Sequence, residues 1–247
     1  TQVVAMRGSR GNDSEGGNET DISSVSVAAH ELKSPLVLLR QLSLDLASGE
    51  LSDNERTRVM EQLVQVSEKA LRLTSDLTRA ERLQSSLFPL EPVNPISVCD
   101  DVTYELQRLY QAHGRSLKRS RIRHLPPVVA NRDLLRRILL NFADNALHYS
   151  DEQGVVELHA QLLREAGLVR VGVRDYGPAV SMKNWRELTD SLDTTKPVQA
   201  RPQSSGLGLY IAHQFATAMN GRIGAIRHHD GASFYVELPI SKQLSLL

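Results

Sequence analysis

The chain has 247 residues and a formal net charge of zero, with 29 Lys and Arg against 29 Asp and Glu. This balance gives no indication of nucleic acid as a partner, and we expect no nucleic-acid binding. Cys99 is the single cysteine, which excludes an intrachain disulfide framework and a zinc site built from several cysteines.

The first segment, residues 1–20, is rich in Gly, Ser, Asn and charged residues and has no sustained apolar period. This composition indicates a disordered linker or a cloning remnant. No run of roughly eighteen apolar residues occurs anywhere, so no membrane-spanning segment is predicted. We expect a cytoplasmic location, either for a whole protein or for the cytoplasmic portion of a membrane-bound sensor whose membrane segments are absent from this chain.

Residues 21–86 predict two long helices. Apolar residues in the first alternate at spacings of three and four, apart from a polar interruption at Ser43; they are Ile22, Val25, Ala29, Leu32, Leu36, Leu39 and Leu46. After a polar break, Ser52 and Glu55 have the spacing of a capping box that begins a second helix. The apolar residues of the second helix form a seam with unbroken spacings of four and three; they are Val59, Leu63, Val66, Ala70, Leu73, Leu77 and Ala80.

Two such helices joined by a short turn predict an antiparallel hairpin. A lone hairpin buries both seams poorly, whereas two hairpins paired into a four-helix bundle bury them well. We therefore expect a homodimer through the hairpin. The alternative is a hairpin that docks on the rest of its own chain.

Three prolines, Pro89, Pro92 and Pro95, mark a domain boundary, so a second domain is expected over residues 87–247. Its pattern mixes helices with strands and predicts an α+β fold in two packed layers, an α/β sandwich. Helices are expected over residues 96–113, 131–147 and 207–219, with Asn131 as an N-cap. Strands are expected over residues 155–163, 168–174, 223–227 and 233–238.

The first helix carries His30-Glu31-Leu32-Lys33-Ser34-Pro35. Glu31 is suited to accept the imidazole proton of His30, which would make the ring a better nucleophile toward a phosphoryl group. Pro35 has no N–H for the Glu31 carbonyl, so we expect a kink beside the histidine. Taken alone, a histidine on a helix more often has a structural or surface role.

Three motifs in the second domain point to a nucleotide. Asn141 and Asn145 lie four residues apart and share one helix face, where amide oxygens are suitable Mg²⁺ ligands. Asp175 ends a strand, where a buried carboxylate can accept the adenine amine. The glycines of Ser205-Gly206-Leu207-Gly208-Leu209 allow backbone N–H groups to approach phosphate at a helix start. Each motif alone also fits a plain surface helix, turn or loop.

In this order the motifs resemble those of the sensor histidine kinases of two-component signalling, from about Asp21 to the C-terminus. The resemblance implies that His30 is phosphorylated from Mg-ATP, with Glu31 as the base, and that an Asp of a response regulator receiver domain then takes the phosphoryl group. It also implies a Bergerat-type ATP-binding catalytic domain with the turn Gly231-Ala232-Ser233-Phe234. The implied nucleotide contacts are Asn141, Asn145, His148, Tyr149, Asp175, Gly177, Ala179, Ser205, Gly206, Leu207, Gly208 and Leu209, the first two holding Mg²⁺.

The chain departs from the family pattern at four places. Ser34 stands where Thr or Asn is common, which leaves response-regulator phosphatase activity open. His148 replaces a lysine, and Ala179 replaces the second glycine of its box. The expected lid, residues 181–205, has no phenylalanine, although Lys196 and Arg201 are suited to contact the γ-phosphate. The alternatives are therefore a degenerate kinase that acts as a dimeric signalling scaffold and a Bergerat-fold ATPase.

Overall fold

The computed structural model describes residues 2–5, 17–81, 88–121, 124–150, 154–178, 181–182, 185 and 207–242. The chain divides into two compact units. The hairpin unit comprises residues 14–82; the other unit, which contains the expected catalytic domain and is called the catalytic unit below, comprises residues 83–247 together with residues 1–13.

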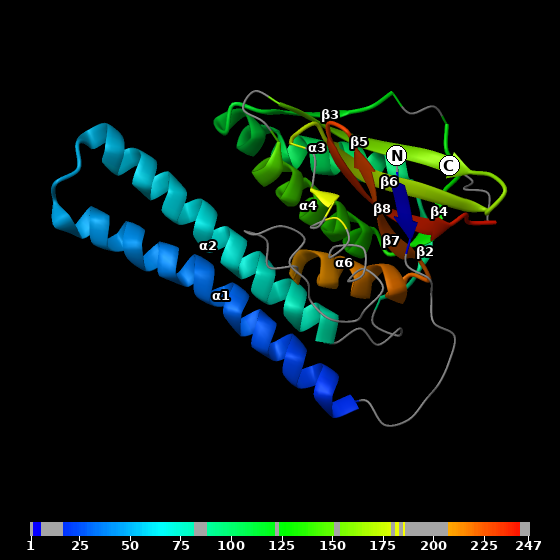
Figure 1. Cartoon of the computed structure of the whole chain (residues 1–247), viewed down its shortest axis with the longest axis horizontal. Coiled ribbons are helices and arrows are strands. Elements are labelled where there is room, and N and C mark those ends of the chain that lie inside the picture. The colour runs from blue at the N-terminus through cyan, green and yellow to red at the C-terminus, as the bar shows by residue number, and fades with distance from the viewer. Residues whose placement is uncertain are drawn as a thin grey trace. The chain divides into compact units, whose positions relative to one another are not determined.

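The hairpin unit consists of α1 (Gly17–Ser48) and α2 (Asp53–Glu81), which run antiparallel (Figure 1). The capping box before α2 forms as predicted in one half: Ser52 N donates to Glu55 Oε2 at 3.0 Å. In the other half, Ser52 Oγ donates to the same oxygen at 2.6 Å instead of accepting from the backbone. These bonds from Ser52 lower the pKa of Glu55. None of the described helices is both long and apolar enough to cross a membrane.

The two helices bury only part of their apolar surface against each other. Leu42 is buried, and Val59, Leu63 and Val66 are half-buried. Of the two leucines that flank Ser43, Leu42 therefore faces the packed side while Leu44 is 50% exposed. Among the described side chains of the hairpin, the exposed large apolar ones are Leu36, Val37, Leu38, Leu44, Met60, Val64 and Leu71.

The catalytic unit is built on a six-stranded sheet. Its order is β1 (Gln2–Ala5), β7 (Arg222–His228), β8 (Gly231–Pro239), β6 (Leu168–Asp175), β5 (Val155–Leu163) and β3 (Ser116–Arg119). β3 pairs parallel with β5, and the other neighbours pair antiparallel. A second, two-stranded sheet joins β2 (Glu91–Val93) to β4 (Val128–Ala130).

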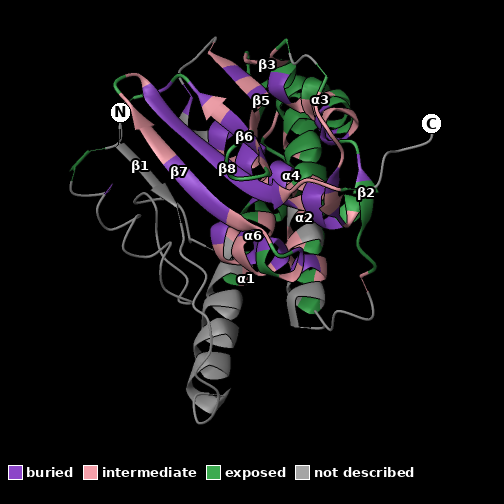
Figure 2. Ribbon diagram, turned by 90° about the vertical axis from the view of Figure 1, so that its right-hand side faces the viewer, coloured by how far each residue is buried: buried purple, intermediate pink, exposed green. Residues whose placement is uncertain are grey.

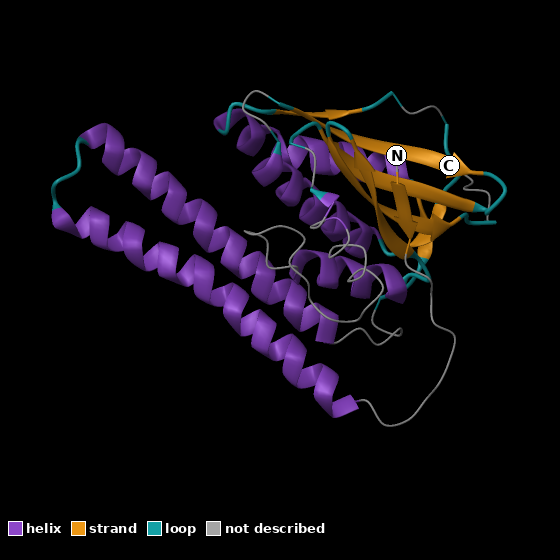
Figure 3. Cartoon of the chain, in the orientation of Figure 1, coloured by secondary structure: helices purple, strands orange, loops and turns teal. Residues whose placement is uncertain are grey.

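Three helices cover one face of this sheet (Figure 3): α3 (Pro95–Ala112), α4 (Arg132–Tyr149) and α6 (Leu207–Ala218). The core between the layers is aliphatic with a few aromatic rings, and the central strands are largely buried (Figure 2). Phe142 of α4 meets Phe234 of β8 with ring centroids 6.0 Å apart. The predicted α+β sandwich is confirmed.

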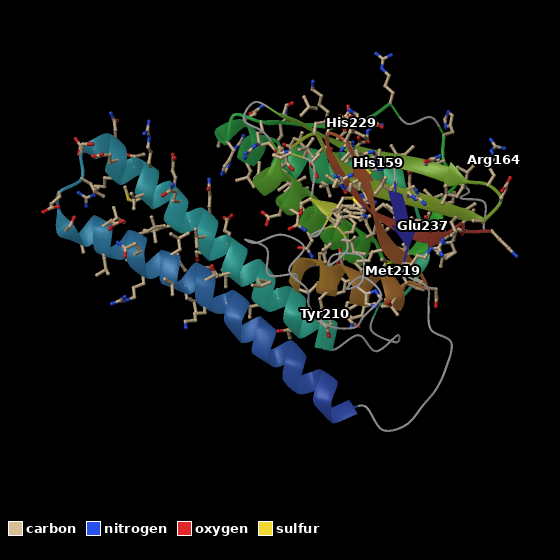
Figure 4. The ribbon with its side chains drawn as sticks, in the orientation of Figure 1. His159, Arg164, Tyr210, Met219, His229 and Glu237 are labelled. Carbon is tan, nitrogen blue, oxygen red and sulfur yellow. The ribbon has the colours of Figure 1, made fainter. Side chains whose placement is uncertain are left out.

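The opposite face of the sheet carries a layer of paired polar groups. Glu237 of β8, whose side chain is fully buried, receives ion pairs from Arg170 at 2.5 Å and from Arg222 at 2.5 Å. The Arg170 guanidinium also lies over the Tyr235 ring, 4.0 Å from its centroid. His159 of β5 lies on this face too, opposite Gly172 (Figure 4). The buried charge of Glu237 is therefore balanced by arginines from both neighbouring strands, β6 and β7.

The structure differs from prediction in its short strands. Gln2–Ala5 forms β1, and α1 already begins at Gly17, so the prediction of disorder over residues 1–20 is wrong at both places. The reason is tertiary: Val3 and Val4 suit an extended strand, and the edge of β7 offers backbone partners. The strands β2, β3 and β4 were also missed, because three or four residues carry too little alternation to be recognised.

Candidate nucleotide site

The helix that carries the two asparagines is fixed firmly at its start. Asn131 is the N-cap of α4, and its Oδ1 accepts hydrogen bonds from Asp133 N at 3.1 Å and Leu134 N at 3.2 Å. The buried face of α4 includes Leu135, Ile138, Leu139 and Phe142. This packing sets the rotation of the helix, so the flank of the buried face is equally fixed.

Asn141 and Asn145 lie on that flank, beside the buried face, and are both half-buried. Asn141 Nδ2 reaches the Gly208 carbonyl at 3.5 Å, the outer limit of a hydrogen bond, so α4 and the first turn of α6 face each other here. His148 and Tyr149 belong to the last turn of α4, but their side chains lie outside the described part.

A tyrosine supports the same stretch of α4 from the α3 side. Tyr110 is buried, and its hydroxyl donates to the Ala143 carbonyl at 2.7 Å. Burial raises the pKa of Tyr110, and the nearby Asp144 adds to the shift, so the phenol stays protonated as a donor. Sequence reasoning missed this residue, since the bond joins positions 33 apart in the chain.

Asp175 is the last residue of β6 and is 2% exposed, as expected for a buried carboxylate at a strand end. Its Oδ1 accepts from Gly177 N at 3.3 Å and from Ala232 N at 3.2 Å. These bonds hold the carboxylate between two loops, the one after β6 and the turn from β7 to β8.

Gly231 makes that close approach feasible. Its φ is +123°, in the region that favours glycine, and an added Cβ would meet Asp175 Oδ1 at 2.5 Å. Any other residue would push the turn away from the carboxylate. The glycine turn that the sequence singled out therefore packs directly on Asp175.

Tyr176 points away from the buried carboxylate. Its ring lies under the Arg174 guanidinium, 4.4 Å from the ring centroid, and its hydroxyl donates to Glu157 Oε2 at 3.0 Å. Arg174 also pairs with Asp230 Oδ1 at 2.5 Å. Sequence reasoning missed Arg174 and Asp230, although their positions beside Asp175 and Gly231 are a signal that could have found them.

Gly208 leaves space at the start of α6. Among the described residues, an added Cβ would meet only Asn141, at 4.0 Å, which is ordinary contact. Leu209, next in sequence, is buried and anchors the helix in the core. Ser205 and Gly206 lie outside the described residues, as does the side chain of Leu207.

Most of the expected lid also lies outside the described residues, including Lys196 and Arg201. Ala179, which precedes the lid, lies outside them as well. Trp185 is a lid residue that the structure does describe. It is 2% exposed, and its backbone N–H donates to the Ser181 carbonyl at 2.8 Å. The indole Nε1 is buried without a hydrogen-bond partner among the described residues. Trp185 is thus an apolar anchor in a segment that lacks phenylalanine. The sequence signal was that it is the single tryptophan of the chain.

The expected phosphoacceptor box, His30 to Pro35, lies in the other unit. His30 and Glu31 are within α1, but their side chains lie outside the described part. Ser34, one helical turn after His30, is exposed, and the helix continues through Pro35. The structure therefore brings Asp175, Gly177, Gly231, Asn141 and Gly208 into one unit and leaves the histidine in a separate one.

The residues of the catalytic unit fit a purine nucleotide. The buried carboxylate at the strand end is suited to bind an amine. The two half-buried asparagine amides are suited to a hard cation, and the open backbone at the helix start is suited to phosphate. Phosphate oxygens and water would complete the shell of a Mg²⁺ ion, which takes few protein ligands.

Residues 130–242 match the family model described as histidine kinase-, DNA gyrase B-, and HSP90-like ATPase. The adaptive-response sensory kinase SasA of Parasynechococcus marenigrum (strain WH8102) is 28% identical over 218 residues, which cover 87% of this chain and 55% of that protein. The chain spans about half the length of the curated relatives it matches.

Solved structures share this fold. Full-length ShkA in complex with AMPPNP superposes with a TM-score of 0.60 at 25% identity, over 91% of this chain and 47% of that one. The histidine kinase ThkA in complex with the response regulator protein TrrA has a TM-score of 0.60 at 17% identity, over 89% of this chain and 62% of that one, and shows the shared fold. Residues 130–242 therefore form a domain of the histidine kinase-, DNA gyrase B-, and HSP90-like ATPase type, and the chain as a whole is similar to sensor histidine kinases.

Proposed function

We propose that the chain phosphorylates itself on His30 from Mg-ATP and passes the phosphoryl group to an Asp of a response regulator. The observation that carries this proposal is the pairing of two parts in one chain. One unit has a helix with the acceptor box, and the other has a buried Asp175 beside Gly177 and Gly231. We assign residues 21–86 to dimerisation and phosphotransfer and residues 87–247 to catalysis.

In this proposal, Asp175 accepts the exocyclic amine of adenine and rejects guanine, which presents an oxygen there. Asn141 and Asn145 hold Mg²⁺ through their amide oxygens. The backbone from Gly206 to Gly208 approaches the phosphates at the start of α6. The remaining proposed contacts are His148, Tyr149, Gly177, Ala179, Lys196, Arg201, Ser205, Leu207 and Leu209.

The chemistry divides between the two units. ATP supplies a γ-phosphoryl group whose transfer needs mainly positioning and neutralisation of charge. Glu31 accepts the ring proton of His30 as the imidazole bonds to the γ-phosphorus, the bond to the bridging oxygen breaks and ADP leaves. The exposure of Ser34, on the same helix face as His30, supports access to this face by an incoming domain.

We also propose a homodimer through the hairpin. Its support is the set of exposed apolar side chains on both helices, of which Val64 is 59% and Leu71 is 68% exposed. Exposed surface of this kind on paired helices marks an interface. The response regulator partner is supported by the complex of ThkA, which shares the fold, with TrrA. Since ATP is the proposed substrate, we place the reaction in the cytoplasm.

The test is incubation with γ-labelled ATP and Mg²⁺, comparing the parent chain with His30→Ala. His229→Ala is the matched control, because the side chain of His229 is 94% exposed and lies in the catalytic unit. We expect acid-labile, alkali-stable label that is lost only in His30→Ala. Addition of a receiver domain should then move the label to it.

The alternatives give different results in the same assay. A degenerate scaffold would dimerise without acquiring label and would bind ATP weakly. A Bergerat-fold ATPase would release phosphate at the same rate with and without His30. Either result would refute the kinase proposal, and a label that persists in His30→Ala would refute the assignment of the acceptor.

A further inference from the structure

The two outer edges of the six-stranded sheet are protected in different ways. β3, at one edge, has four residues, carries Lys118 and Arg119 and packs against α3. Short length and positive charge are common means of blocking an edge against other strands. At the other side, β7 has seven residues, contains no proline, and is uncharged from Ile223 to Ile226. By itself β7 would be a strand edge open to pairing.

β1 covers this stretch. The register pairs Gln2 with Arg227, Val3 with Ile226, Val4 with Ala225 and Ala5 with Gly224. All four residues of β1 take part, and they cover three of the four uncharged positions of β7. An uncharged, β-branched segment therefore lies along the part of the edge that lacks protection of its own.

The covering strand comes from an unexpected place in the chain. It precedes the acceptor helix α1, yet it belongs to the catalytic unit and not to the hairpin unit. The eleven residues 6–16 connect it to α1 and span at most about 40 Å when fully extended. The hairpin is thus joined to the catalytic unit on both sides, by residues 6–16 before α1 and by residues 82–87 after α2.

We propose that the free edge of β7 is a docking site for the segment that precedes the acceptor helix, and that this strand acts as a releasable strap on the catalytic unit. While β1 is paired, two connections restrain the catalytic unit relative to His30. Once β1 leaves, only the connection after α2 remains. A pairing of four residues is short enough to open without unfolding the rest of the sheet.

The consequence for activity rests on the proposed kinase function, because the catalytic unit must carry the γ-phosphate to His30. The strap slows that movement when paired and permits it when released. A signal that draws the segment before α1 away from β7 would raise the rate of autophosphorylation.

A cross-link tests the docking without reference to activity. Val3→Cys with Ile226→Cys places two thiols at directly opposed positions on one face of the sheet. Val3→Cys with Arg227→Cys is the matched control, since a shift of one residue turns the second thiol to the other face. Cys99 does not compete, because it is buried and burial raises its pKa to about 12. Mild oxidation should form the intrachain disulfide at least tenfold faster in the first pair.

The same pair tests the regulatory role. We expect the oxidised protein to autophosphorylate at least fivefold more slowly than the reduced protein. Val3→Pro with Val4→Pro, which removes two backbone donors, should accelerate the reaction and the hydrogen exchange of residues 224–227. Gly8→Pro with Ser9→Pro is the control outside the strand.

Equal cross-linking in both cysteine pairs, or a disulfide formed only between two chains, would overturn the docking assignment. Efficient cross-linking with no change in rate would overturn the strap. A reduced protein that shows no autophosphorylation would count against the proposed function alone, because the cross-link and the hydrogen exchange still report on docking.

Discussion

The Asp175 carboxylate accepts a hydrogen bond from Ala232 N at 3.2 Å, across 57 positions of the chain. This bond joins the end of β6 to the turn between β7 and β8, and Gly231 provides the clearance for it. The residue expected to select adenine is therefore also a structural tie between two loops. A test of its role must separate these two contributions.

Asp175→Asn separates them. Asparagine keeps an oxygen for Gly177 N and Ala232 N, so the free energy of unfolding should change by less than about 1 kcal/mol. Replacing one carboxylate oxygen by an NH₂ group places a hydrogen-bond donor opposite the adenine amine, which is also a donor. A hydrogen bond to a charged group contributes about 1.5–3 kcal/mol, so we expect ATP affinity to fall tenfold or more. Isothermal titration with ATP measures this loss. Tyr176→Phe, which removes only the bond to Glu157, is the control. An affinity equal to that of the parent chain would remove Asp175 from the adenine site.

A second comparison uses two glycines, Gly208 at the start of α6 and Gly172 in β6. Among the described residues, an alanine Cβ at Gly208 meets nothing closer than Asn141 at 4.0 Å, so Gly208→Ala should fold as well as the parent chain, or better by up to about 1 kcal/mol. We expect its ATP affinity to fall about tenfold, because the methyl group occupies the space left for phosphate. At Gly172 the Cβ would meet the Phe234 carbonyl at 2.5 Å, so Gly172→Ala should lose about 1–3 kcal/mol of stability. Thermal unfolding and nucleotide titration of both variants check this contrast, which fails if Gly208→Ala binds ATP normally.

The sequence predicted well those parts of the fold that are encoded locally. β5 and β6 have the alternating pattern of a half-buried strand, and the structure has them at Val155–Leu163 and Leu168–Asp175. The Asn131 cap was equally visible, because capping depends on the residue type next to a helix start. Asp175 was placed correctly because it follows a recognisable strand.

The parts that were not predicted depend on contacts between distant segments. β1 becomes a strand because β7 lies beside it, and the sequence of Gln2–Ala5 does not predict that pairing. The hydrogen bond from Tyr110 to Ala143 and the stacking of Arg174 on Tyr176 require the packed layers to exist first. In the sequence, Trp185 was one of several large apolar residues in the lid, and its burial is a property of the folded core.

The N-cap of α4 should contribute measurably to stability. Asn131 Oδ1 accepts two backbone hydrogen bonds at the start of the helix that carries Asn141 and Asn145. Asn131→Ala should cost about 1 kcal/mol of unfolding free energy, within the usual range for a lost cap. Asn131→Asp keeps the capping oxygen and loses only the bond from Nδ2 to the Pro89 carbonyl, so it should stay close to the parent chain. Denaturant titrations that rank the two variants equally would show that the cap is unimportant.

Acid should weaken the catalytic unit through its buried histidines. Burial lowers the pKa of His159, His213 and His228. At His159 the charge of Glu157 opposes this effect, and the charges of Arg170, Arg174 and His228 add to it. As the pH falls, these histidines are therefore protonated in the unfolded chain before they are protonated in the folded chain. The stability from neutral histidines is fully present above about pH 6.5 and is lost as the pH falls toward the lowered pKa values, by up to about 1.4 kcal/mol per pH unit for each proton.

Denaturant unfolding followed by the fluorescence of Trp185, the single tryptophan, measures this loss in the catalytic unit between about pH 5 and pH 8. His159→Gln should reduce the pH dependence, because the imidazole that cannot be protonated on the folded sheet is gone. His229→Gln removes a side chain that is 94% exposed, so it should leave the dependence as it was. If His159→Gln unfolds with the same pH dependence as the parent chain, the buried imidazole does not set the acid sensitivity of the sheet.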